Sequence, residues 1–188
     1  MLLQQVAIPS LPNYARIHGE TLHAVLTRMS TNEKQLQRTL DEGFRLMEMR
    51  HAYLAEALAH ELAEISDRGV QSVTYYVAVT IYLSFVERFG HHLLPITSQQ
   101  IHELASRLIV DGELRQLGPC GDSYSEDLVA IAQPELCRFA RDEADRADDM
   151  RKGPSVEEAC TVPFAALLLE IIALSLAVDA TASASSWV

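Results

Sequence analysis

The sequence predicts an all-α protein, a single-domain bundle of six to seven helices, from two observations. Ser or Thr precedes Glu or Gln by three positions, the spacing of an N-terminal capping box, at Ser30–Glu33, Thr97–Gln100, Ser123–Glu126 and Ser155–Glu158. Stretches with apolar residues at every third or fourth position follow these boxes, as amphipathic helices require. The expected domain covers residues 1–188, with an ordered core over 12–180 and a frayed tail over 181–188.

The first two predicted helices cover residues 12–29 and about 31–66. The first carries one mainly apolar stripe: Ala15, His18, Leu22, Val25 and Met29. The second keeps an apolar stripe along its whole length, which would make a rod of roughly 50 Å. Such a rod is longer than a bundle of this size needs. We therefore expect either that Gly43 breaks it or that a second copy of the chain covers the projecting part.

Residues 70–89 alternate apolar β-branched positions with polar ones, a pattern typical of a β-strand. A strand needs a partner, and the sequence contains no second convincing strand. A buried helix is therefore the favoured interpretation. In that helix, one polar stripe would contain Thr80, Ser84, Glu87 and His91.

The remaining helices are predicted at about 98–110, 124–132, 134–150 and 156–180. Glycine and proline residues separate them. The last contains the apolar run Val162–Val178, interrupted by Glu170. A membrane-spanning helix wants about 20 residues and rarely holds a central acid. We therefore expect a buried core or interface helix and no membrane association.

Composition narrows the class of partner. The chain has 15 Lys and Arg residues against 26 Asp and Glu residues, a formal net charge of −11. This balance makes nucleic acid an unlikely partner and favours a basic one. The three cysteines do not form a disulfide framework, and the N-terminus lacks the basic region of a secretory signal. We therefore expect a cytoplasmic protein. The chain also prefers arginine over lysine, which is common in GC-rich bacterial genomes and suggests a bacterial source.

Two Glu-x-x-His pairs, Glu20–His23 and Glu48–His51, raise the possibility of a metal site, because bundle di-iron proteins use this spacing. The alternative hypothesis is a metalloenzyme that binds iron, manganese or zinc through Glu48, His51, Glu87 and His91. A core histidine that bonds a neighbouring side chain explains His51 more simply. We therefore expect no cofactor, and the sequence assigns no catalytic residue.

Two further segments suggest other roles. Residues 97–118 resemble the recognition helix and first wing strand of a winged-helix regulator, although the helix offers only Arg107 as a phosphate contact. The charged run 138–152 predicts a solvated helix with paired charges, whose arginines could also dock an acidic partner. Cys120 is expected to be an ordinary loop thiol, while Cys137 and Cys160 are expected in helices as core residues.

The sequence therefore favours a non-enzymatic helical protein-interaction module. An adaptor, an inhibitor, an immunity-type protein or an assembly factor would fit, and self-association is expected. The helical-bundle metalloenzyme is the alternative, and the winged-helix regulator is the third hypothesis.

Overall fold

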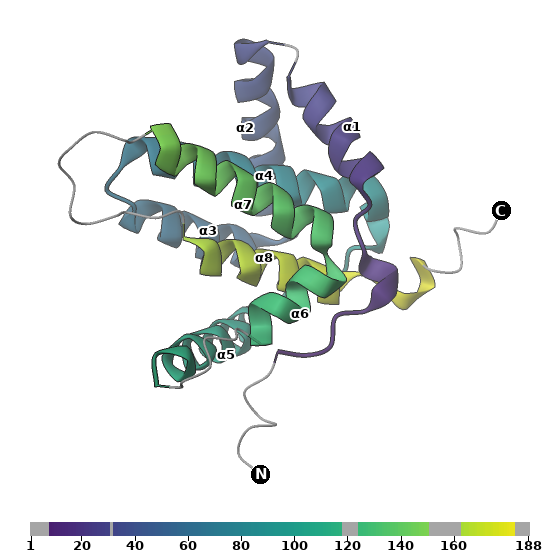
Figure 1. Ribbon diagram of the computed structural model, residues 1–188. Coiled ribbons are helices and arrows are strands. Elements are labelled where there is room, and N and C mark those ends of the chain that lie inside the picture. The colour runs from purple at the N-terminus through teal and green to yellow at the C-terminus, as the bar shows by residue number, and fades with distance from the viewer. Residues whose placement is uncertain (1–7, 31, 118–123, 151–162, 183–188) are drawn as a thin grey trace.

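A computed structural model describes residues 8–30, 32–117, 124–150 and 163–182 of the chain. Within these ranges eight α-helices form a bundle (Figure 1). They are α1 (Gly19–Met29), α2 (Glu33–Arg50), α3 (Ala52–Glu64), α4 (Arg68–Phe89), α5 (Ser98–Leu117), α6 (Tyr124–Ala132), α7 (Pro134–Met150) and α8 (Phe164–Ala177). The described ranges contain no strand and one isolated bridge, between Leu93 and Val178. The all-α prediction is confirmed.

The centre of the bundle is α4, which packs against most of the other helices. Every residue from Val77 to Phe85 is buried. The hydroxyl groups of Thr74, Thr80 and Ser84 donate hydrogen bonds to the carbonyl four residues earlier, at 2.7–2.8 Å. These bonds satisfy the hydroxyls inside the core, which explains how a helix with polar positions on several sides can be buried all round. Helix is therefore the correct interpretation of residues 70–89.

By length and composition alone, the helical segment 68–92 could cross a membrane. However, 61% of the apolar stretch is buried inside the bundle. That burial is the ordinary situation of a core helix.

The C-terminal helix α8 is the second buried helix. It contacts α3, α4, α5, α6 and α7, and every residue from Leu167 to Ser175 is buried. The expectation of an apolar, buried C-terminal helix is confirmed, with its start at Phe164. The predicted first turns, over 156–162, lie outside the described residues.

Side chains cap the starts of two helices, one at the predicted box Thr97–Gln100 and one at Asp67, which was not predicted as a cap. Thr97 and Gln100 form a reciprocal cap, in which Gln100 N–H donates to Thr97 Oγ1 and Thr97 N–H donates to Gln100 Oε1. At α4, the Asp67 carboxylate accepts from the amides of Gly69 and Val70 at 2.8 and 3.0 Å. These bonds satisfy amide groups that have no partner within their own helix.

The predicted box at Ser30 is wrong. Asn32 caps α2 by accepting from Gln35 N–H at 2.8 Å, while the Ser30 hydroxyl donates to the Thr27 carbonyl. Ser123 and Ser155, the other two predicted caps, lie outside the described residues.

The predicted helix over 12–29 is shorter than expected because the side chain of Gln133 holds residues 15–17 in another conformation. Its Oε1 atom accepts from Ile17 N–H at 2.9 Å, and its amide donates to the Ala15 carbonyl at 2.7 Å. A short 3-10 turn (Asn13–Ala15) and an extended segment therefore precede α1. The contact partners lie more than 100 residues apart in sequence, at separations of 116 and 118.

The predicted long helix over 31–66 is two helices, which is why the bundle has one helix more than the upper estimate. The chain breaks at His51, with φ −137° and ψ 56°, and not at Gly43. Gly43 lies buried in α2, where an added Cβ would come within 2.7 Å of Val79 on α4. Glycine at this position allows the two helices to approach closely. The break removes the projecting rod that the sequence suggested.

The predicted wing strand after residue 110 is also wrong. Helix α5 continues through Asp111 and Gly112 to Leu117. A buried Asp111 side chain, 7% exposed, lies within this helix. The recognition-helix resemblance therefore has no wing in the part of the chain that the structure describes.

Candidate interaction site

The corner between α2 and α3 is fixed by the buried imidazole of His51. Its Nε2 atom lies 3.2 Å from the carbonyl oxygen of Leu94, and its Nδ1 atom lies 3.2 Å from the hydroxyl of Tyr82 on α4. The His51 residue is 2% exposed and Tyr82 is fully buried. One side chain therefore connects the corner, the central helix and the segment that follows α4.

The direction of these bonds follows from the chemistry of the partners. A carbonyl oxygen can only accept, so Nε2 carries the proton and donates to Leu94. In the neutral ring Nδ1 is then an acceptor, so the single proton of the Tyr82 hydroxyl is shared between Nδ1 and the Leu46 carbonyl, at 3.2 and 3.3 Å. Desolvation by burial lowers the pKa of His51, against the opposing effect of the bond to Leu94. Burial likewise raises the pKa of Tyr82 to about 12, so both groups are neutral near pH 7.

The segment that contains Leu94 is held in place from its other side by α8. Leu94 N–H donates to the Ala177 carbonyl, and Asp179 N–H donates to the His92 carbonyl, both at 2.8 Å. Gly90, at φ 52°, ends α4 and starts the turn that leads into this segment. Backbone bonds to α8 and to Asp179 thus position the Leu94 segment, whose carbonyl accepts the hydrogen bond from His51 Nε2–H.

Five exposed residues lie next to His51 in the chain or in the segment that it contacts, and we call them the corner patch: Glu48, Met49, Arg50, Tyr53 and Leu94. The apolar members are strongly exposed, with Met49 at 76%, Tyr53 at 49% and Leu94 at 47%. Arg50 reaches the Gly90 carbonyl at 3.5 Å. Tyrosine, methionine and arginine are among the residue types most enriched in protein interfaces.

The four predicted metal ligands do not converge. Glu48 is exposed on α2, and both nitrogens of the buried His51 already have partners. His91 is exposed in the turn after α4, with its ring 4.0 Å from that of His92. Among the described residues no three His, Cys, Asp or Glu side chains form a group that could hold a metal ion. The metalloenzyme hypothesis therefore has no geometric site in these ranges and stays a hypothesis from sequence.

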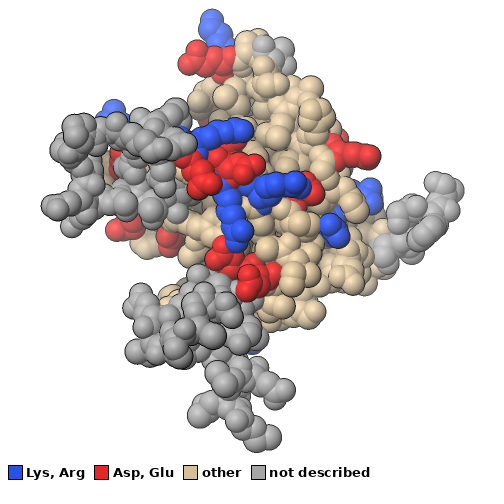
Figure 2. Space-filling view, viewed as in Figure 1, with Lys and Arg blue, Asp and Glu red and all other residues tan. Residues whose placement is uncertain are grey.

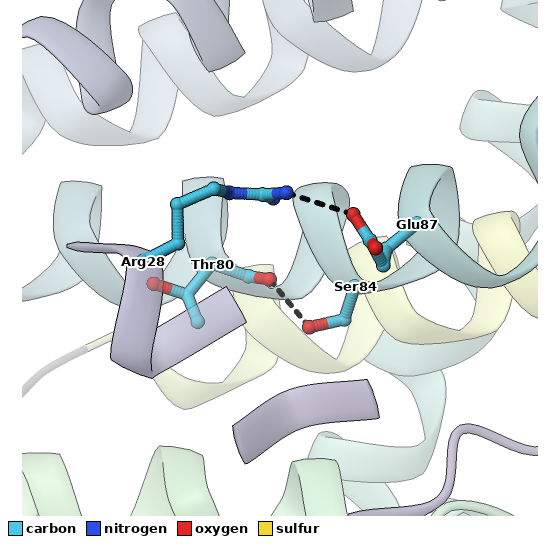
Figure 3. A network of polar contacts seen from close by, with 4 residues as sticks. All are labelled: Arg28, Thr80, Ser84 and Glu87. Atoms are coloured by element: carbon cyan, nitrogen blue, oxygen red, sulfur yellow. Dashed lines mark hydrogen bonds and ion pairs between the residues drawn. The ribbon is translucent and has the colours of Figure 1, made fainter. Parts of the chain in front are cut away.

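The fourth predicted ligand, Glu87, is used to connect two helices. Its carboxylate accepts from the guanidinium of Arg28 at 2.9 Å, and Figure 3 shows the two side chains reaching toward each other from α4 and α1. Both are nearly half exposed, at 48% and 44%, so solvent screens the pair and its contribution to stability is small. Thr80 and Ser84, the other polar-stripe residues in Figure 3, bond within α4.

Sequence analysis placed His51 on an apolar stripe but did not find its partners. Tyr82 and Leu94 lie 31 and 43 residues away along the chain, and nothing local marks them. Met49 and Tyr53 did carry a usable signal, because both interrupt the polar side of an otherwise amphipathic pattern.

Comparison with known proteins adds no further assignment. No protein-family model, no curated protein and no solved structure matches this chain.

Replacing His51 with leucine should change the pH dependence of stability. The fold should remain, because the Tyr82 O–H keeps its bond to the Leu46 carbonyl and the Leu94 segment keeps its backbone bonds to Ala177 and Asp179. Because the pKa of His51 is lowered in the folded state, the unfolded chain takes up the proton first. The wild type should therefore lose stability as pH falls through about 6.5, and His51→Leu should lack that loss. Urea unfolding between pH 5 and 8 measures this difference, and the exposed His60→Leu serves as the control. Parallel pH profiles for wild type and His51→Leu would contradict the assignment of a neutral, buried imidazole.

Proposed function

We propose that the chain is a cytosolic protein-interaction module that associates with a second copy of itself through the corner patch. The observation that carries the proposal is the exposure of three large apolar side chains around a histidine whose two ring nitrogens are both bonded. A surface on such a fixed support loses little conformational freedom when it binds.

The charges of the patch favour a second copy as the occupant. A net charge of −11 repels another copy over most of the surface. The corner patch instead pairs one acid, Glu48, with one base, Arg50. In a two-fold contact each patch meets its own image, so Glu48 of one copy can face Arg50 of the other, twice. Apolar contact then supplies affinity, while the two charge pairs supply register.

The helical module could serve as an adaptor, inhibitor, immunity-type protein or assembly factor, and a basic partner remains the expectation for heterologous binding. No second functional class has a site in its favour among the described residues. The proposal therefore concerns association itself, which is directly measurable.

Sedimentation equilibrium of the purified chain tests the proposal. At tens of micromolar we expect a mass near twice the 20.9 kDa of one chain. Tyr53→Asp should shift the population to monomer, because an unpaired charge would enter the apolar contact. Ile109→Asp, at a residue 62% exposed on α5, is the matched control and should leave association unchanged. A single 20.9 kDa species for the wild type would overturn the proposal.

A further inference from the structure

A groove lies between α1 and α7, with α4 at its base. It has a volume of about 460 Å³ and shares no residue with the corner patch. Leu22 and Leu26 of α1, Tyr76 of α4 and Phe139 of α7 provide its apolar surface. Figure 1 shows α7 crossing in front of α4, with α1 along the neighbouring side. Several residues that line the groove are exposed, among them Thr27, Asp142 and Arg146, so the groove is open to solvent.

The α7 side of the groove carries surplus negative charge. Of the α7 residues that line the groove, three are acids, Glu135, Asp142 and Glu143, and two are arginines, Arg138 and Arg146. Each arginine of α7 already has a carboxylate partner: Arg138 pairs with Glu135, Arg141 with Glu126 and Arg146 with Glu143. Asp142, which lines the groove, makes no ion pair with any described residue. Figure 2 shows these red and blue side chains gathered over α7 on this face.

An aromatic pair lies next to this acidic rim. Tyr76 and Phe139 meet in a T-shaped contact, with ring centroids 6.0 Å apart. The Tyr76 hydroxyl, which is half-buried, forms no hydrogen bond with a described residue. Aromatic faces beside carboxylates attract cations, and the free hydroxyl can accept a hydrogen bond from an ammonium or guanidinium group.

We propose that this groove binds an amphipathic helix of a partner protein that carries Lys or Arg beside its apolar face. The apolar side chains of that helix pack on the partly buried Leu26 and Tyr76 and on the small exposed parts of Leu22 and Phe139, as in other helix-in-groove complexes. Its basic side chains meet Asp142 and the aromatic pair. The sequence made the arginines of α7 candidates for docking an acidic partner, but each of them already has an ion-pair partner. Asp142, which has none among the described residues, is therefore the docking charge.

Heteronuclear NMR of the ¹⁵N-labelled full chain tests this inference with a defined probe. The probe is a synthetic helical peptide with leucine at the i, i+3 and i+7 positions and lysine on both flanks. Its twin replaces every lysine with glutamate. We expect the lysine peptide to shift amide signals of α1 and α7 together with Tyr76, and the glutamate peptide to bind at least about tenfold more weakly.

Variants of the exposed Asp142 distinguish a specific contact with this carboxylate from the attraction of the peptide to the net negative charge of the chain. Asp142→Asn should weaken lysine-peptide binding, and Asp142→Lys should weaken it further, to about tenfold or more. Glu61→Lys on α3 is the matched control, because it changes the net charge equally at an exposed site outside the groove. Circular dichroism verifies that each variant keeps its helices.

Peptide binding in the groove is independent of whether the chain self-associates. Binding of the lysine peptide that maps elsewhere, equal binding of both peptides, or equal loss in Glu61→Lys and Asp142→Lys would overturn it. Absence of any shift at millimolar peptide would also overturn it. A monomeric protein that still binds the lysine peptide in the groove would contradict the corner-patch dimer alone.

Discussion

Leu168→Asp is expected to unfold the protein. Leu168 is 4% exposed in the second turn of α8, and every residue from Leu167 to Ser175 is buried. A carboxylate placed there would lack a partner and would remove apolar contacts at the same time. Such changes cost on the order of 4 kcal/mol or more, which is comparable with the whole stability of many domains.

Far-UV circular dichroism and urea unfolding measure this effect. Ala165→Asp is the matched control, because Ala165 is exposed in the first turn of the same helix. An acid near a helix N-terminus is compatible with the helix dipole, so this control should remain folded. If Leu168→Asp is as stable as the wild type, α8 is not part of the core.

Glu170→Leu is expected to have the opposite effect and to stabilise the fold. Glu170 is 2% exposed on α8, and neither carboxyl oxygen has a hydrogen-bond partner among the described residues. Burial raises the pKa of this carboxyl well above its usual range. Removing a buried polar group that lacks partners should add about 1–3 kcal/mol to the free energy of unfolding, provided the leucine fits.

The gain from Glu170→Leu should depend on pH in a defined direction. The folded state holds the Glu170 proton above the pH at which the unfolded chain releases it, near 4.3. Wild-type stability from this group is therefore greatest below that pH and falls as pH rises toward the folded pKa, by up to about 1.4 kcal/mol per pH unit. Glu170→Leu should lack this fall, so the difference in free energy of unfolding between Glu170→Leu and the wild type should grow as pH rises.

Glu170→Gln distinguishes the two parts of the effect. It removes the titration but leaves an unpaired buried amide, so it should flatten the pH profile with little of the gain in stability. Chemical unfolding of the three proteins from pH 4 to pH 8 measures both quantities. If Glu170→Leu is less stable than the wild type at pH 8, the Glu170 carboxyl makes a stabilising interaction, and the prediction is wrong. His51 acts with the opposite sign near pH 6.5, so the comparison is made between variants and wild type at each pH.

Much of the helical framework could be predicted from local signals. The boundaries of α6 and α7 match the predicted ranges 124–132 and 134–150. The cap at Thr97 depends on side chains within three residues, so the local sequence contains the whole interaction. For residues 70–89 the absence of a second convincing strand favours helix, because their own alternation has the period of a strand.

The features that could not be predicted depend on distant contacts. No glycine, proline or usual capping residue marks the break at His51, which is supported by Tyr82 and Leu94. Gln133 similarly holds residues 15 and 17 from the far part of the chain. Sequence periodicity reports which side of a helix is buried, but it does not identify the partner that bends the chain.

The candidate surfaces were only partly visible in the sequence. The charge run of α7 predicted a solvated helix with i, i+4 charge pairs. Charged residues of α7 do pair, but the two ion pairs within the helix have i, i+3 spacing. The third pair, from Arg141 to Glu126 on α6, depends on tertiary packing. That packing decides which charges are paired, and among the described residues it leaves Asp142 of the groove without an ion-pair partner.

A charge-exchange experiment tests the corner-patch dimer most directly. Glu48→Arg places a second arginine opposite Arg50 of the other copy, and Arg50→Glu places a second acid opposite Glu48. Each variant alone should therefore be monomeric by sedimentation equilibrium. An equimolar mixture should associate like the wild type, because each contact then joins opposite charges. Dimerisation of either variant alone to the wild-type extent, or a monomeric mixture of two folded variants, would contradict the proposed interface.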